Sequence, residues 1–163
     1  MLHLPDSVRA MKFALAVVAA LAASACAKTA DDLGQGGAGA PGSQQDFVVN
    51  VGDRVFFETD SSELTPTAQA TLTKQAAWLS RYGNYSFTIE GHADERGTRE
   101  YNFALGARRA QAAHDYLVSK GLAASRMRTV SYGKERPVAT CDDISCWSQN
   151  RRAVTVLSGA PGS

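Results

Sequence analysis

The chain has 163 residues and a formal net charge of +1, which suits one domain of roughly 100–150 residues with short extensions. Hydrophobic residues make up 44% of the sequence and charged residues 20%, as in an ordinary globular protein. The near-zero charge argues against a nucleic-acid-binding protein, which usually carries a basic excess. No apolar run reaches about 18 residues, so no transmembrane helix is expected.

The N-terminal region has the layout of a secretory signal. An uninterrupted apolar stretch covers residues 13–23, follows Lys12 and is followed by small residues. At about 1.5 Å per residue this stretch is too short to cross a bilayer. A buried helix is the alternative, but a Gly-rich tract rarely follows one. We therefore expect a signal peptide over residues 1–25, with Met11 as an alternative true start.

The signal ends at Ala23-Ser24-Ala25-Cys26, which resembles the lipobox of bacterial lipoproteins. In a lipobox the cysteine becomes the acylated first residue of the mature chain, so Cys26 would anchor the protein in lipid at about 0.8 kcal/mol per buried CH₂. Ala23 stands where the usual lipobox has leucine. Cleavage by an ordinary signal peptidase, which would leave Cys26 free, is the alternative. Residues 26–46 are then a flexible linker, because their glycines cannot bury a core.

We expect one folded domain over residues 47–158 and a disordered tail over 159–163. β-branched and aromatic runs, with period-two alternation in places, predict strands at residues 47–51 with 54–57, 85–90, 127–132 and 153–157. A first helix begins with Thr65 as N-cap and Pro66 at its first position. A second helix is capped by Thr98 and runs to about residue 120.

The order β-α-β-α-β-β predicts an α/β fold, an α+β sandwich, with a mixed four-stranded sheet. Both helices should cover one face of it, because right-handed crossovers place them there. The inner stripe of the second helix is expected at Phe103, Gly106, Ala110, Ala113 and Leu117. Residues 133–150 are expected to form a loop.

Two cysteines, Cys141 and Cys146, lie five apart in that loop. In an exported protein both would meet an oxidising compartment, so a disulfide is expected, with two separate thiols as the alternative. No Cys or His pair lies nearby to complete four ligands, so no metal is expected. Trp147 is interpreted as packing under this loop, and Arg151 with Arg152 as bracketing the last strand.

Two segments carry residues that could bind a ligand. Residues 91–97 follow a predicted strand and contain Asp94, whereas Arg109 borders the inner stripe of the second helix. Helical side chains lean toward the N-terminus, so the guanidinium should point back toward Asn102 and the Asp94 segment. A carboxylate and a guanidinium facing one concavity can grip a zwitterionic amino acid. A structural ion pair between Asp94 and Arg109 is the alternative.

Six motifs in order along residues 53–157 resemble the OmpA-like peptidoglycan-binding domain family. They are VFFETDS at 55–61, GHADERGT at 91–98, YN at 101–102, Leu105 with Arg109-Ala110, SYGKE at 131–135 and NRRA at 150–153. The lipobox and the Gly-rich tether fit the lipid-anchored members of this family. The resemblance implies that the ligand is the meso-diaminopimelate part of the peptidoglycan stem peptide.

The resemblance also implies residue roles. Asp94 would receive the ammonium group of diaminopimelate and Arg109 its carboxylate. Further residues would line the pocket, add hydrogen bonds or contact the methylene chain, namely Asp60, Arg96, Thr98, Asn102 and Leu105. No cofactor and no metal are implied.

By the same resemblance the protein is not an enzyme. It would sit lipid-anchored in the outer membrane, with its domain in the periplasm, and would have TolB of the Tol complex as a competing partner during envelope constriction. The rival hypothesis is a periplasmic cell-wall hydrolase, in which Glu90, His92 and Asp94 act as a metal or acid–base cluster. Against it, the sequence has no third zinc ligand nearby, no HExxH and no nucleophile elbow.

Overall fold

The computed structural model describes residues 39–159 of the chain. The predicted signal peptide, Cys26 and residues 160–163 of the predicted tail lie outside this part. Within it, no helix is long and apolar enough to span a bilayer.

Four strands form one mixed sheet in the order β1-β4-β2-β3. Their bounds are β1 Arg54–Phe56, β2 Ser86–His92, β3 Met127–Gly133 and β4 Arg152–Ser158. β2 and β3 are parallel, with Phe87 opposite Met127, whereas β4 is antiparallel to both β1 and β2. The predicted mixed four-stranded sheet is confirmed.

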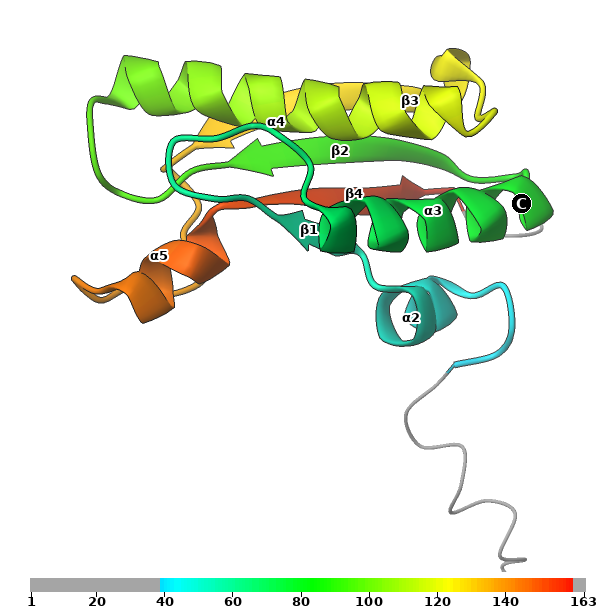
Figure 1. The fold of residues 1–163 in the computed structure, drawn as a ribbon. Coiled ribbons are helices and arrows are strands. Elements are labelled where there is room, and N and C mark those ends of the chain that lie inside the picture. The colour runs from blue at the N-terminus through cyan, green and yellow to red at the C-terminus, as the bar shows by residue number, and fades with distance from the viewer. Residues whose placement is uncertain (1–38, 160–163) are drawn as a thin grey trace, which may run out of the picture. The chain divides into compact units, whose positions relative to one another are not determined.

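Two long helices, α3 (Pro66–Arg81) and α4 (Arg99–Ser119), lie on the same face of the sheet (Figure 1). Both predicted caps are confirmed, because Thr65 Oγ1 accepts from the Ala68 amide and Thr98 Oγ1 from the Tyr101 amide. The core lies between these helices and the sheet, and its most buried side chains include Leu72, Leu79, Phe87, Ile89 and Leu117.

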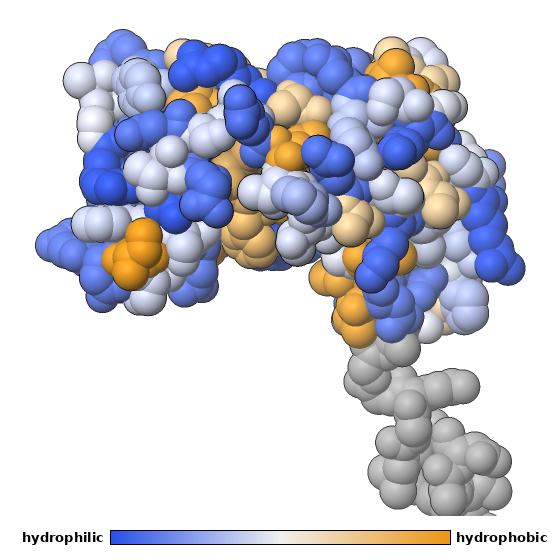
Figure 2. Space-filling view, viewed as in Figure 1, coloured by the Kyte–Doolittle hydropathy of each residue, from blue (hydrophilic) through white to orange (hydrophobic). Residues whose placement is uncertain are grey.

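The strand predicted over residues 47–51 is wrong. A short helix α2 (Gln44–Asp46) leads into a π-helical turn, η2 (Phe47–Val51). Phe47 is fully buried, with its ring 4.9 Å from that of Trp78. Val48 and Val49 are 45% and 49% exposed, and the surface beside α2 shows hydrophobic patches (Figure 2). The turn forms because packing on Trp78 overrides the β propensity of the valines.

The packed chain also begins earlier than the predicted boundary at residue 47. The Tyr85 hydroxyl donates to the Gly42 carbonyl at 2.9 Å, and Trp78 Nε1 donates to Asp46 Oδ2 at 2.9 Å. The end of the predicted linker is therefore fixed by hydrogen bonds to Trp78, near the end of α3, and to Tyr85, just before β2. The chain enters the domain beside the first residue of β2.

Two further expectations need correction. Phe103 is 57% exposed, whereas Asn102, Leu105 and Arg109 are buried on the inner side of α4 beside Gly106. Polar side chains take the inner positions because backbone carbonyls there accept their hydrogen bonds. The predicted loop over residues 133–150 contains a helix, α5 (Ile144–Asn150), which Asp143 caps by accepting from the Ser145 amide at 2.7 Å.

A contact between two glycines sets how closely α4 approaches β2. A Cβ atom added to Gly91 would lie 1.8 Å from the Gly106 carbonyl oxygen. One added to Gly106 would lie 2.4 Å from Ser131 Oγ and 2.8 Å from the Gly91 oxygen. The helix and the strand therefore touch backbone to backbone, next to the end of β2 from which the Asp94 segment emerges.

Gly91→Ala is expected to destabilise the domain by about 3 kcal/mol, because the added methyl group meets a backbone oxygen that cannot rotate away. Thermal denaturation should record a fall in Tm of roughly 10 °C or more. Gly83→Ala is the matched control, since a Cβ there meets nothing within 4 Å. An unchanged Tm for Gly91→Ala would refute the close approach.

Candidate functional site

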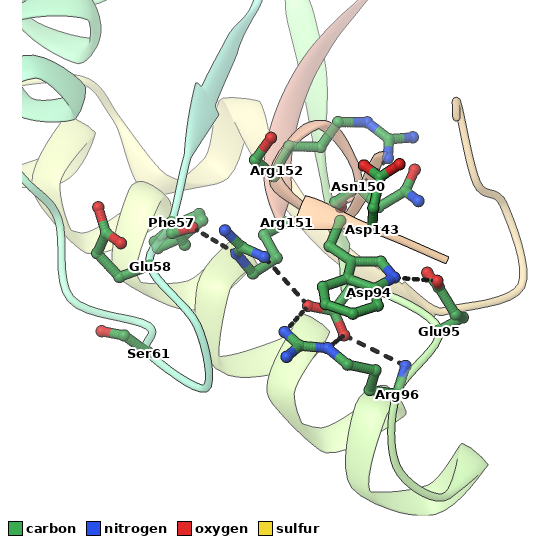
Figure 3. Close-up of polar contacts among 12 residues, drawn as sticks. Phe57, Glu58, Ser61, Asp94, Glu95, Arg96, Asp143, Asn150, Arg151 and Arg152 are labelled. Carbon is green, nitrogen blue, oxygen red and sulfur yellow. Dashed lines mark hydrogen bonds and ion pairs between the residues drawn. The ribbon is translucent and has the colours of Figure 1, made fainter. Parts of the chain in front are cut away.

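The candidate site lies where the end of β2, the loop after β1, the first half of α4 and the start of β4 meet (Figure 3). Asp94 is at its centre. This carboxylate is 7% exposed, and its Oδ2 lies 2.6 Å from Arg96 Nη2 and 3.3 Å from Arg151 Nη1. Burial would raise the pKa of Asp94, but the hydrogen bonds from Arg96 and Arg151 outweigh burial and hold the pKa below its usual value.

Arg109 is completely buried, and its three hydrogen bonds within residues 39–159 all go to backbone carbonyls. Its Nε lies 2.8 Å from Ser61 O, its Nη1 2.8 Å from His92 O and its Nη2 3.1 Å from Glu58 O. Burial lowers the pKa of Arg109 to about 10, although Asp94 oppositely favours the charged form. The guanidinium thus ties the loop after β1 to the end of β2.

The structural ion pair between Asp94 and Arg109 is not formed, because Asp94 pairs with Arg96 and Arg151 instead. Two buried guanidinium groups, those of Arg109 and Arg151, therefore face one buried carboxylate. Because buried charges must be paired or hydrogen-bonded, the three carbonyls that accept from Arg109 are what allow a second buried guanidinium beside a single carboxylate.

The loop after β1 contributes Asp60, which lies exposed with a φ of 54°. This left-handed backbone conformation is uncommon outside glycine, although aspartate tolerates it better than most residues. The Asp60 charge acts on both Arg96 and Arg109, since it favours their charged forms. Asp60 therefore belongs to the same cluster of charges as Asp94.

The other predicted residues frame this cluster. Asn102 is buried, and its Nδ2 donates to the Arg96 carbonyl at 2.7 Å, which fixes the turn after Asp94. Thr98 is exposed and caps α4. Leu105 is buried but lies outside the main hydrophobic cluster. The structure thus gathers Asp60, Asp94, Arg96 and Arg109 by their charges, and uses Asn102 and Thr98 to shape the backbone around them.

Two residues of this region were not predicted as site residues. Trp147 does not simply pack under the cysteine loop, because the Arg96 guanidinium lies 4.3 Å from its ring centre and its Nε1 donates to Glu95 Oε1. Arg151 donates to Phe57 O at 3.0 Å as well as pairing with Asp94. The NRRA motif at 150–153 pointed to Arg151, whereas no local pattern marks Trp147.

The cysteine loop lies beside these contacts. Cys141 and Cys146 are joined by a disulfide with Cα atoms 5.7 Å apart. Asn150, at the end of α5, accepts from the Val138 amide at 2.8 Å and donates to the Ala139 carbonyl at 2.8 Å. The disulfide therefore links the start of α5 to the preceding loop, and the Asn150 hydrogen bonds link its end to that loop.

The residues of the rival hydrolase hypothesis lie in a different arrangement. His92 is buried with its ring 5.6 Å from that of Tyr132, and its Nε2 lies 3.7 Å from Glu90 Oε2. Asp94 is instead bonded to two arginines. Across residues 39–159 no three His, Cys, Asp or Glu side chains are grouped so that they could hold a metal ion.

Burial, followed by the charge of Arg152, lowers the pKa of His92 from 6.5 to about 4. In the unfolded chain His92 binds a proton near pH 6.5, whereas in the folded chain it binds one only near pH 4. Stability should therefore fall by about 3 kcal/mol as the pH drops from 6.5 to 4, with no further loss from this group below that. Denaturant titrations at several pH values should show this slope, and His92→Gln should flatten it. A slope that persists in His92→Gln would contradict the assignment.

Comparison with known proteins shows the family to which the chain belongs. Residues 56–151 match the OmpA family. Over 154 residues the chain is 66% identical to the peptidoglycan-associated lipoprotein of Agrobacterium fabrum, covering 90% of this chain and 87% of the relative. It is 42% identical to that of Pseudomonas aeruginosa, covering 85% and 91%. The chain belongs to the OmpA family, among its peptidoglycan-associated lipoproteins. The family resemblance inferred from the six motifs is confirmed.

Solved structures give the same result. The peptidoglycan-associated lipoprotein of Burkholderia pseudomallei matches with a TM-score of 0.63 and 42% identity, covering 65% of this chain and 90% of that one. The C-terminal domain of Helicobacter pylori MotB matches with a TM-score of 0.62 at 20% identity, covering 66% and 85%, and shares the fold. The predicted OmpA-like fold is confirmed.

Proposed function

We propose that this lipoprotein binds peptidoglycan non-covalently through the end of β2, and that its ligand is the diaminopimelate end of a stem peptide. One observation carries the proposal. Asp94 and Arg109 lie at the same end of the sheet and the Asp94 charge favours the charged form of Arg109, yet the two are not paired together. A ligand with one ammonium and one carboxylate group complements two opposite charges that are held apart.

The ammonium group would bind Asp94 in place of Arg96. Arg96 can leave because its side chain is 40% exposed, whereas Arg151 is buried and continues to support the carboxylate. The chain already surrounds Asp94 with donors, so a ligand ammonium replaces one cation with another and leaves no charge unpaired.

The ligand carboxylate would bind Arg109. A guanidinium has five N–H donors in a planar fork, and the Arg109 fork matches a carboxylate in a bidentate arrangement. The Glu58 carbonyl is the partner that the carboxylate would displace, since its distance of 3.1 Å from Nη2 is the longest of the three. Asp60 lies on the same loop, so this loop would move when the ligand enters.

The proposal extends to the place of the protein in the cell. Acylation of Cys26 would hold the chain in the outer membrane, and the domain would grip the wall from the periplasm without cleaving it. Its relatives are named peptidoglycan-associated lipoproteins, which supports both the lipid anchor and the association with the wall. The family resemblance adds TolB of the Tol complex as a competing partner, and with it a role in envelope integrity and cell division.

Asp94→Ala should abolish co-sedimentation with purified sacculi, because loss of the carboxylate leaves the ligand ammonium without a partner and takes from Arg151 its charged partner, at about 2–5 kcal/mol. Arg109→Lys should also fail to bind, since a lysine keeps the charge but not the fork. Arg108→Ala is the matched control, an exposed arginine one position away on α4.

Circular dichroism should show that the three variants are folded. Binding by both Asp94→Ala and Arg109→Lys at the level of the unaltered chain would refute the site. Release of soluble muropeptides by the unaltered chain would refute non-catalytic binding and favour the hydrolase.

Cys26→Ser should move the protein from the membrane fraction to the soluble fraction, because the acyl chains supply the anchor. Mass spectrometry of the unaltered chain should find the acyl groups on Cys26. If Cys26→Ser stays with the membrane after peptidoglycan is digested, the proposed acylation is wrong.

A further inference from the structure

α5 touches the candidate site but contributes little to the main core. It has seven residues, of which Cys146 and Asn150 are buried, and none belongs to the main hydrophobic cluster. Ile144 is 60% exposed, and α5 projects from the end of the sheet (Figure 1). A helix this short is not stable without support from its surroundings. Something other than core packing must hold α5 in place.

Three local restraints supply that support. The Cys141–Cys146 disulfide closes a ring across the first turn of α5. Asp143 caps the start of the helix. The side chain of Asn150, the last residue of α5, is hydrogen-bonded to the backbone of Val138 and Ala139. A covalent link and a side-chain amide therefore hold the two ends of α5 to the loop that precedes it.

From this fixed position α5 reaches the ligand segment. The Trp147 ring makes a cation–π contact with Arg96, and its Nε1 donates a hydrogen bond to Glu95. One side chain therefore contacts both residues that follow Asp94. Arg151, directly after α5, pairs with Asp94 itself. Figure 3 shows Arg151 on one side of Asp94 and Arg96 on the other.

Packing alone does not fix the ligand segment against the cysteine loop. A cavity of about 360 Å³ lies between them, and its lining includes Ala93, Glu95, Lys134, Ala139, Cys141 and Asn150. A hollow of this size provides no dispersion contacts to resist a shift of either wall. Polar contacts therefore set the position of Glu95 and Arg96: Asn102 and Lys134 hold their backbone carbonyls, and Trp147 holds both of their side chains.

We propose that α5, braced by the Cys141–Cys146 disulfide, is a platform that positions the ligand segment, with Trp147 as its positioning residue. This inference rests on the proposed peptidoglycan site. Trp147 contacts the Arg96 guanidinium while that group is bonded to Asp94, and its ring would retain the guanidinium when a ligand ammonium displaces it from the carboxylate. Without the platform, the side chains of Glu95 and Arg96 would shift over the cavity, and the domain would bind peptidoglycan less well.

Trp147 variants of the full chain should show the effect in sacculus-binding titrations. Trp147→Ala removes a cation–π contact and a hydrogen bond to a carboxylate, so binding should weaken about tenfold. Trp147→Phe keeps a ring for Arg96 and should recover part of that loss. Ile144→Ser, on the exposed side of the same helix, is the control and should bind like the unaltered chain.

A spectroscopic measurement separates positioning from overall stability. In a Trp78→Phe background Trp147 is the remaining tryptophan, and its fluorescence should change when soluble diaminopimelate-containing peptide displaces Arg96. The Cys141→Ser/Cys146→Ser double variant should alter this signal before ligand is added and should bind sacculi several-fold more weakly.

Unaltered binding by both Trp147→Ala and the double cysteine variant would overturn the platform, while Asp94→Ala still failed to bind. If the unaltered chain itself did not bind sacculi, the proposed function would fail instead.

Discussion

The buried guanidinium of Arg109 is the interaction on which the ligand end of this domain depends. It joins two segments that are far apart in the sequence, the loop after β1 and the last residue of β2, through three backbone carbonyls. Because those carbonyls are neutral, no carboxylate of the protein neutralises the arginine at the point where the proposed ligand carboxylate would bind. One side chain thus serves the fold in the free protein and, on the proposed function, the ligand in the complex.

The sequence predicts local features of this fold well and tertiary ones poorly. Thr65 and Thr98 are identified as caps because the bonds they accept lie three residues ahead in the chain. Phe47 is misassigned because its partner, Trp78, lies about thirty residues away and no local pattern reports it. Phe103 is misassigned because an apolar residue usually faces inward, whereas here Asn102 and Arg109 take the inner side through bonds to distant carbonyls.

In the candidate site, too, the sequence predicts single residues well and the contacts between distant residues poorly. Arg109 stands out because a charged residue beside an apolar stripe needs a partner. Asp94 stands out because it lies in a segment directly after a strand, and family motifs give the remaining positions. The pairing within the site could not be foreseen, because Arg151 lies 57 residues from Asp94 in the sequence and Trp147 belongs to a helix whose sequence resembles a loop. These contacts depend on how the cysteine loop folds back, which composition does not encode.

The docking of Gly42 against Tyr85 has a mechanical consequence. The chain from the N-terminus enters beside the first residue of β2, whereas the ligand segment leaves from its last residue. On the proposed function, with Cys26 anchored in lipid and the site holding peptidoglycan, tension between the two would run lengthwise along this strand, over about 20 Å. The ladder bonds of β2 to β3 and β4 lie across that direction, so they would be loaded together in shear and not opened one after another. β2, which lies between β4 and β3 in the sheet, would bear this force.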